Sequence, residues 1–242
     1  MREVCPSTIR RALILELVYG QTDQQMGMQL YGFWRSIASF RVRTALKLKG
    51  VRFEEIAVDI LAGKQFEPDY QVINAEQVVP TLVHDGHTIF QSLAIIEYLD
   101  EVEPEPPLIP ADACDRAYVR SLALVAVADA HPLVTPRVRN HLAKTFGAND
   151  AVIQEWAKHW TLEGLSIYER LLSRRSAALF VVGDNPGLAD ICIAGQVVGA
   201  HLLKLGLGEF PMVSRVADRC FDLPAFATSH PFEQEGYRVA GQ

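Results

Sequence analysis

The strongest constraint on the fold is a hairpin signal in the first half of the chain. Residues 81–84 and 87–90 are strand-like runs that flank Asp85-Gly86, a dipeptide that favours a tight two-residue turn between antiparallel strands. Gln91-Ser92 follows directly and opens an apolar helix, which we expect Ser92 to cap. The segment therefore predicts two antiparallel strands followed by a helix.

The residues before the hairpin predict a strand, a helix and a second strand. A short strand is expected at 28–33 and a helix at about 39–49, which Gly50 ends. Alternating apolar residues predict the second strand at about 53–59, followed by a polar helical or loop stretch to Asn74. Together the two patterns predict a thioredoxin-like α/β domain.

A proline cluster at 103–110 separates this pattern from a region with a different period. Proline-rich stretches commonly connect domains. Beyond the cluster, the apolar residues of 153–172 recur at three-to-five spacing, which is the stripe of an amphipathic helix. We therefore expect an N-terminal extension over 1–27, a thioredoxin-like α/β domain over 28–106 and an all-α domain over 112–242.

Charge and cysteine usage restrict the class of protein. The formal net charge of -6 disfavours a general affinity for nucleic acid or for an anionic membrane, since both need a basic face. No apolar run reaches the ~18 residues that span a bilayer. Cys5, Cys114, Cys192 and Cys220 are scattered, which favours buried reduced thiols in a cytoplasmic protein. The histidines form no cluster with acidic or cysteine residues, so we expect no metal site.

Hydroxyl groups stand where a redox thioredoxin would carry its two cysteines. The four positions at the start of the first helix read Ser36-Ile37-Ala38-Ser39, so disulfide exchange is excluded there. A hydroxyl at a helix N-terminus, where unpaired N–H groups and the helix dipole favour an anion, would help a bound thiol to ionise near neutral pH. The alternative is that Ser36 and Ser39 only cap the helix.

Two further features suit a small anionic peptide. Val79-Pro80 occupies the place where thioredoxin-like domains keep a cis-proline, whose geometry exposes backbone groups to a bound peptide. The alternative is an ordinary trans proline at the first residue of an edge strand. Gln91-Ser92 gives a second helix N-terminus able to hold a carboxylate. With Ser36, these residues could bind a short thiol peptide such as glutathione.

At these motifs the chain resembles the zeta class of glutathione transferases, which includes maleylacetoacetate and maleylpyruvate isomerases. The resemblance runs from about Leu30 to Pro231. It is carried by Arg35-Ser36-x-x-Ser39-x-Arg41-Val42-Arg43, Val79-Pro80-Thr81-Leu82 and Gln91-Ser92-Leu93-Ala94-Ile95-Ile96-Glu97-Tyr98-Leu99. Support in the second half comes from His131-Pro132-Leu133, Gly183-Asp184, Leu188-Ala189-Asp190 and Ser229-His230-Pro231.

The resemblance implies a site, a reaction and an assembly. It implies a homodimer in which Ser36 and Arg35 are catalytic, and in which Arg35 and Arg137 bind the substrate. The residues implied to bind glutathione are Ser36, Lys64, Gln65, Val79, Pro80, Gln91, Ser92 and His131. In the family, the glutathione thiolate adds to a cis double bond conjugated to carbonyls, the former alkene rotates, and loss of the thiolate gives the trans isomer.

The chain departs from the family at several site positions. Ile37 and Ala38 replace a serine and a cysteine common at the helix start, and Leu202 stands where the resemblance places an arginine for a substrate carboxylate. We therefore expect weak affinity for diacids unless Arg137 or Lys204 replaces that arginine. Three functions stay open: a cis–trans isomerase of a maleylacetoacetate-like product of aromatic ring cleavage, a transferase that conjugates or dehalogenates small electrophiles, and a non-catalytic glutathione-binding protein.

Overall fold

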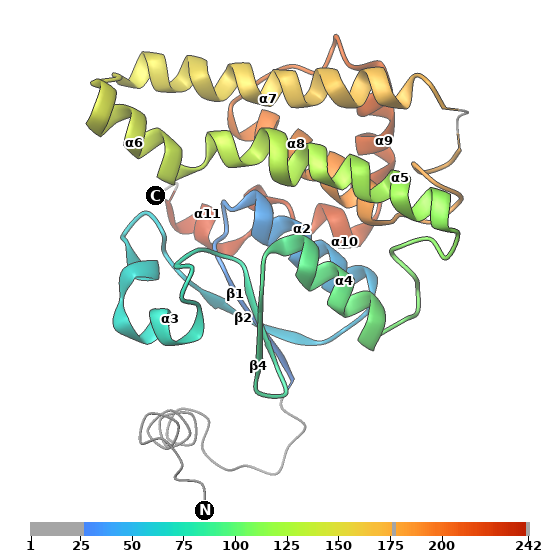
Figure 1. Ribbon diagram of the computed structural model, residues 1–242, viewed down its shortest axis with the longest axis horizontal. Helices are drawn as coiled ribbons and strands as arrows, with labels where there is room; N and C mark the ends of the chain where they lie inside the picture. The colour runs from blue at the N-terminus through green and yellow to red at the C-terminus, as the bar shows by residue number, and fades with distance from the viewer. Residues whose placement is uncertain (1–26, 176–177, 241–242) are drawn as a thin grey trace, which may run out of the picture.

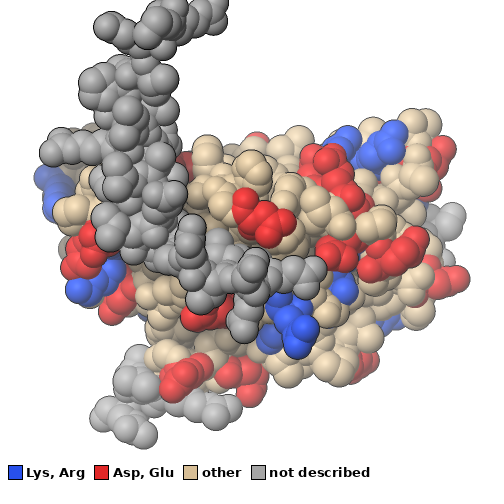
Figure 2. All heavy atoms as spheres, turned by 90° about the horizontal axis from the view of Figure 1, so that it is seen from below, with Lys and Arg blue, Asp and Glu red and all other residues tan. Residues whose placement is uncertain are grey.

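A small mixed sheet with helices against it lies below a larger layer of helices in the computed structural model (Figure 1). The structure describes residues 27–175 and 178–240. The expected extension over 1–27 therefore lies, except for Gly27, outside the described residues, as does Cys5. On the face seen in Figure 2, acidic side chains are interspersed with smaller groups of lysine and arginine.

The sheet has four strands in the order β2-β1-β3-β4. These are β1 (Met28–Gly32), β2 (Phe53–Ala57), β3 (Thr81–His84) and β4 (His87–Phe90). β1 pairs parallel with β2, across a helical crossover, and antiparallel with β3. The predicted hairpin is confirmed: β3 and β4 flank Asp85 and Gly86, whose φ angles of 48° and 75° match a two-residue turn of the primed type.

The helices of this domain confirm the predicted order and correct two of its details. They are α2 (Ile37–Leu48), a 3₁₀ turn η1 (Lys64–Phe66), α3 (Pro68–Ile73) and α4 (Ser92–Val102). α2 begins two residues earlier than expected because the Ser36 hydroxyl already caps it, accepting the Ser39 N–H at 3.1 Å. Ser92 is the first residue of α4 and not its cap, since Gln91 holds the cap position with φ 69°.

The second region is helical, as expected. Its helices are α5 (Ala113–Leu124), a π-helical turn η2 (Val125–Ala130), a 3₁₀ turn η3 (His131–Val134), α6 (Pro136–Phe146), α7 (Asp150–Leu172), α8 (Leu188–Leu202), α9 (Pro211–Phe221), α10 (Pro224–Ala227), a 3₁₀ turn η4 (Pro231–Glu233) and α11 (Glu235–Ala240). α8 is buried from Leu188 to Ala200 and forms the centre of this layer. No helix or strand lies between α4 and α5, where the proline cluster stands.

One helical stretch bears on the expected absence of a membrane segment. Ala113–Phe146 is 34 residues long and contains a window with mean hydropathy 1.2, enough by length and composition to cross a bilayer. In this fold its first helix, α5, packs against α8, and its η2 turn packs against α7. Within that apolar window, 33% is buried by the rest of the protein.

The two domains meet where α2 packs against α8. Glycines in α8 permit this close approach, because a Cβ atom added at Gly199 would lie 3.0 Å from Ile37 Cδ1. A second link runs through the connecting segment: Asp100 of α4, which pairs with Lys49 at 2.5 Å, accepts the backbone N–H of Leu108 at 2.7 Å. The Leu108 carbonyl in turn accepts the Leu188 N–H of α8 at 2.8 Å. The start of α2 is therefore held by both domains.

The cysteine expectation is correct for two of the three described residues. Cys192 and Cys220 are free and buried, whereas Cys114 is free and exposed. Cys114 lies in the first turn of α5, whose N-terminal turn is capped by Asp112 at the surface. The expectation that it is buried was wrong, because the start of α5 lies at the protein surface and leaves the Cys114 side chain exposed.

Candidate functional site

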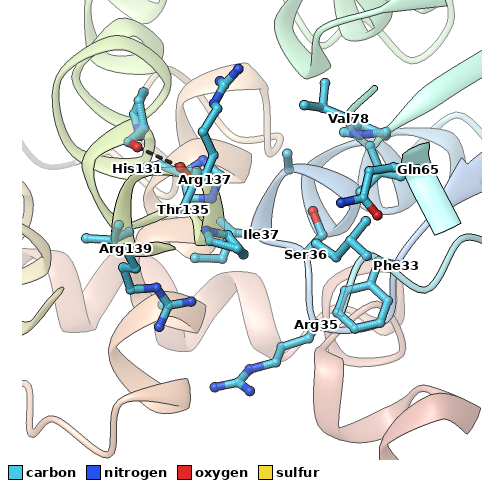
Figure 3. A pocket seen from close by; sticks show the side chains of 18 of the residues that line it. Phe33, Arg35, Ser36, Ile37, Gln65, Val78, His131, Thr135, Arg137 and Arg139 are labelled. Carbon is cyan, nitrogen blue, oxygen red and sulfur yellow. Dashed lines mark hydrogen bonds between the residues drawn. The ribbon is translucent and has the colours of Figure 1, made fainter. Parts of the chain in front are cut away.

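A cavity of about 780 Å³ lies between the two domains. The start of α2, the loop before β3 and the start of α4 form one wall, whereas η3, α6 and the end of α8 form the other. Figure 3 shows Ser36 and Gln65 on one side of the space and the residues of η3 and α6 on the other. Both domains therefore contribute side chains to one site.

Ser36 lines this cavity at the N-terminus of α2. Its Oγ accepts the Ser39 N–H at 3.1 Å, and Ser39 Oγ in turn accepts the Phe33 N–H at 3.2 Å. A hydroxyl that accepts one hydrogen bond keeps its own O–H for donation. The two expected roles of Ser36 are therefore compatible: the residue caps the helix and can still donate to an anion.

The peptide bond between Val79 and Pro80 is cis, and both residues line the cavity. The loop before them is fixed by two side chains from the α3 region: Tyr70 Oη donates to the Val78 carbonyl at 2.6 Å, and Asn74 Nδ2 does so at 3.0 Å. The sequence interpretation missed Tyr70 and Asn74, because no motif marks residues that support a binding loop from behind.

The start of α4 is tied to a buried arginine. Arg41 of α2 is 2% exposed, and its Nε donates to Ser92 Oγ at 3.0 Å. Burial lowers the pKa of this guanidinium, and its Nη1 has no hydrogen-bond partner among the described residues. Gln91 is exposed, and its Nε2 donates to both carboxylate oxygens of Glu76, at 2.7 and 2.9 Å. The Ser92 hydroxyl is thus oriented by a positive charge beside the cavity.

His131, at the start of η3, faces the cavity from the helical side. Burial, together with the positive charge of Arg41, lowers the pKa of its imidazole to about 3. The ring is therefore neutral at pH 7, able to donate through one nitrogen and accept through the other.

The cavity is electropositive. Among its described lining residues, five are basic and one, Glu76, is acidic; the basic ones are Arg35, Arg41, Arg137, Arg139 and Lys144. Sequence reasoning predicted Arg35 and Arg137 as substrate residues but missed Arg139 and Lys144. The available signal was the spacing of basic residues along α6, which places three cations on one short helix.

The remaining residues predicted from the sequence differ in whether they line the cavity. Gln65 lines the cavity, whereas the Lys64 side chain is 54% exposed, pairs with Glu67 at 2.7 Å and is not part of the lining. Lys204 also lies outside it. Leu202 lines the cavity together with Ile37, giving part of the wall an apolar surface.

Metal chemistry was not expected. Within the described ranges, no group of three or more histidine, cysteine, aspartate or glutamate side chains is arranged to hold a metal ion. His84, one of the two hairpin histidines, instead hydrogen-bonds Tyr98 Oη through Nδ1 at 2.8 Å.

Comparison with known proteins identifies the family. Residues 26–101 match the glutathione S-transferase N-terminal domain. The chain is 40% identical over 210 residues to a maleylpyruvate isomerase from a Ralstonia species, with 86% of this chain and 98% of that protein covered.

Solved structures agree over nearly the same span. A maleylacetoacetate isomerase from Methylobacterium extorquens AM1, with bound malonate and glutathione, is 39% identical with a TM-score of 0.83, covering 86% of this chain and 98% of its own. A holo maleylpyruvate isomerase, described as a bacterial zeta-class glutathione transferase, is 38% identical with a TM-score of 0.81 over the same shares. This chain therefore belongs to the zeta class of glutathione transferases, the family of the maleylacetoacetate and maleylpyruvate isomerases.

Proposed function

We propose that this protein is a glutathione-dependent cis–trans isomerase of a small maleyl diacid such as maleylpyruvate or maleylacetoacetate. The observation that carries the proposal is the position of Ser36. Its hydroxyl lies at the N-terminus of α2, in a cavity lined by five basic residues and one acidic residue. A site of that charge favours both a thiolate and an anionic substrate.

The sheet-side wall has groups that fit glutathione. Ser36 offers an O–H, the cis peptide at Val79–Pro80 lies at the cavity, and Ser92 stands at the start of α4 beside Arg41. Helix N-termini and oriented hydroxyls bind carboxylates and other anions. We assign Gln65, Gln91 and His131 to the same binding surface. Lys64 remains a candidate only if its pairing with Glu67 breaks on binding.

Bound glutathione supplies the nucleophile, a thiolate that adds reversibly to the conjugated double bond so that the bond can rotate. Ser36 donates its hydroxyl hydrogen to that sulfur and so favours the thiolate over the thiol. Arg35 and Arg137 provide positive charge for substrate carboxylates, since planar guanidinium groups suit bidentate carboxylate recognition. Neutral His131 adds a hydrogen-bond donor without a further charge.

The relatives named above support this assignment, because they are maleylpyruvate and maleylacetoacetate isomerases. By the same similarity we infer a cytoplasmic homodimer. The two domains contribute to different parts of the site: residues 28–106 supply most of the glutathione site, and residues 112–242 supply most of the substrate wall.

A second function is conjugation or dehalogenation of small electrophiles. The observation that favours it is the apolar character of Ile37, Ala38 and Leu202, all of which line the cavity. Uncharged electrophiles would gain from these contacts without needing a second cation. A non-catalytic glutathione-binding protein is the third possibility, and it predicts binding without turnover of either substrate class.

The test is to supply glutathione with maleylpyruvate or maleylacetoacetate and to follow the fumaryl product, beside an uncharged haloarene electrophile. The proposal expects catalytic isomerisation with no net consumption of glutathione. Arg35→Met should then raise KM for the diacid about tenfold, the scale of one charged contact, while sparing the haloarene. Turnover of the haloarene alone would support the transferase instead.

A further inference from the structure

Arg139 has an environment that its contacts with the other described residues do not explain. It lies in α6, lines the cavity, and is partly buried. Its Nε atom is fully buried and has no hydrogen-bond partner within the described part of the chain. A buried donor without a partner costs about 1 to 3 kcal/mol, and more when the group is charged. A carboxylate that pairs with the guanidinium group from the cavity would offset that cost.

A second arginine faces it from the other domain. Figure 3 shows the guanidinium groups of Arg35 and Arg139 pointing toward one another across the lower part of the cavity, whereas Arg137 points the opposite way. Burial, and then the positive charge of Arg35, lower the pKa of Arg139. The two cations are therefore close enough to repel each other.

The described part of the chain provides no acidic partner for this pair. No ion pair among the described residues joins Arg35 or Arg139 to an acidic side chain. Glu76, the one acidic residue of the lining, instead accepts both of its contacts from Gln91. Two facing guanidinium groups without an anion destabilise each other, and one carboxylate between them would reverse the sign of that interaction.

The position of the pair distinguishes a substrate carboxylate from one of glutathione. The groups that fit glutathione lie on the sheet side, at Ser36 and at the start of α4. In Figure 3, Arg139 approaches from the helical side, and the Arg35 guanidinium extends away from the Ser36 hydroxyl. Leu202, at the end of α8, gives an apolar surface where the family resemblance places an arginine.

We propose that Arg139, together with Arg35, binds one carboxylate of the acidic substrate and so replaces the arginine absent at Leu202. In this chain the positive charge of the substrate wall comes from α6, whereas the family pattern places it on α8. This inference rests on the proposed function for the identity of the substrate. The chemistry that it requires is only a small dicarboxylate beside bound glutathione.

The first experiment measures binding and needs no turnover. Succinate, a saturated dicarboxylate that cannot isomerise, is titrated calorimetrically into the glutathione-loaded protein. Arg139→Met should weaken succinate at least tenfold and leave the glutathione Kd within twofold. Arg170→Met is the matched control, because it removes the same charge at a residue that pairs with Glu163 on α7 and lies outside the cavity lining. Failure of the wild type to bind succinate, or equal binding by Arg139→Met, overturns the inference.

The second experiment relocates the charge. In the Arg139→Met background, Leu202→Arg should restore at least half of the lost succinate affinity, because it returns a guanidinium to the same wall. No recovery in a folded double variant would count against a shared subsite. Succinate binding that depends on Arg139 in a protein that does not isomerise maleyl diacids would leave this inference standing and reject the proposed function. The two failures are thereby distinguishable.

Discussion

The two walls of the cavity are built by different means. The sheet-side wall uses backbone geometry and hydroxyls: the N-termini of α2 and α4 and the cis peptide before β3. The helical wall uses long side chains that reach in from separate elements, including His131 of η3 and Arg139 of α6. The main-chain fold therefore positions the binding groups of the sheet-side wall, whereas side-chain rotamers position those of the helical wall.

Both walls depart from the family pattern, but in different ways: the sheet side keeps Ser36 and changes Ile37 and Ala38 beside it, whereas the helical side has Leu202 in place of an arginine. A hydroxyl at a helix N-terminus has few alternatives, since the cap and the donor are one group. A guanidinium has a long stem, so positions on different helices can deliver it to the same space. We therefore expect substitutions on the sheet side to alter chemistry, and those on the helical side to alter substrate choice or stability.

Loss of the Ser36 hydroxyl should have the largest effect. Ser36→Ala removes the donor to the thiolate, so we expect kcat to fall about 100-fold or more while glutathione binding stays within about tenfold. The apparent thiol pKa of the bound complex should rise, measured from the ultraviolet thiolate band against pH.

Ser39→Ala is the matched control for that variant. Ser39 Oγ is buried and accepts the Phe33 N–H at 3.2 Å, so its loss should reduce stability but not shift the thiol pKa. An unchanged thiol pKa in Ser36→Ala would show that the hydroxyl serves only as a cap, and would remove the basis for contrasting the two walls.

Local patterns were sufficient where a short segment determines its own geometry. The turn at Asp85-Gly86 and the cap at Ser36 could be predicted, because both depend on residues within four positions of each other. The start of a helix near Ser92 was right, but the role of Ser92 as its cap was wrong: Gln91 holds the cap position, and the Ser92 hydroxyl accepts from Arg41, which is 51 positions away. A contact between distant residues has no signature in a single segment.

The helical wall could not be predicted for the same reason. Arg139 looks like one more surface cation of an amphipathic helix, and only the packing of α6 against η3 and α7 turns it toward the cavity. Lys64 illustrates the converse, since its sequence position suggested a role that its pairing with Glu67 does not support.

A substitution inside the helical domain, Gly164→Ala, should have an intermediate effect on stability. A Cβ atom at Gly164 of α7 would lie 2.6 Å from Gln196 Nε2 and 2.8 Å from Ala130 Cβ. Overpacking of this kind costs about 1 to 3 kcal/mol, against a gain of about 1 kcal/mol in helix propensity. Gly164→Ala should therefore lower the free energy of unfolding by up to about 2 kcal/mol.

Denaturant unfolding measures that change, and glutathione titration tests its separation from the sheet side. Gly195→Ala in α8 is the comparison, because its added Cβ would lie 3.4 Å from the nearest atoms. Without a clash, this substitution should be neutral or slightly stabilising. If Gly164→Ala weakens glutathione binding more than about threefold in the folded state, the two walls are mechanically coupled and their contrast fails.

The smallest expected effect is a pH dependence that arises in the helical domain. His230 Nε2 faces His201 Nδ1 at 3.3 Å, and burial, with the charge of His201, lowers the pKa of His230 to about 4. As pH falls from about 6.5 toward 4, His230 binds a proton in the unfolded chain but stays neutral in the native protein, so the free energy of unfolding decreases. Asp190 acts in the opposite direction, because burial raises its pKa to about 6 and the native state then gains a proton on acidification.

The variant His230→Gln separates these contributions, because its amide can still accept the Phe232 N–H and donate toward His201. Wild-type stability should fall between pH 7 and pH 5 by about 1 kcal/mol more than that of the variant, a figure reduced for the partial exposure of the ring. Denaturant unfolding at both pH values gives the difference. Since both histidines lie away from the cavity lining, the glutathione Kd should change equally in the two proteins over this range. If the stabilities of the two proteins change in parallel with pH, the pKa of His230 is not lowered by folding. If their glutathione Kd values diverge with pH, protonation of His230 in the helical domain alters glutathione binding on the sheet side.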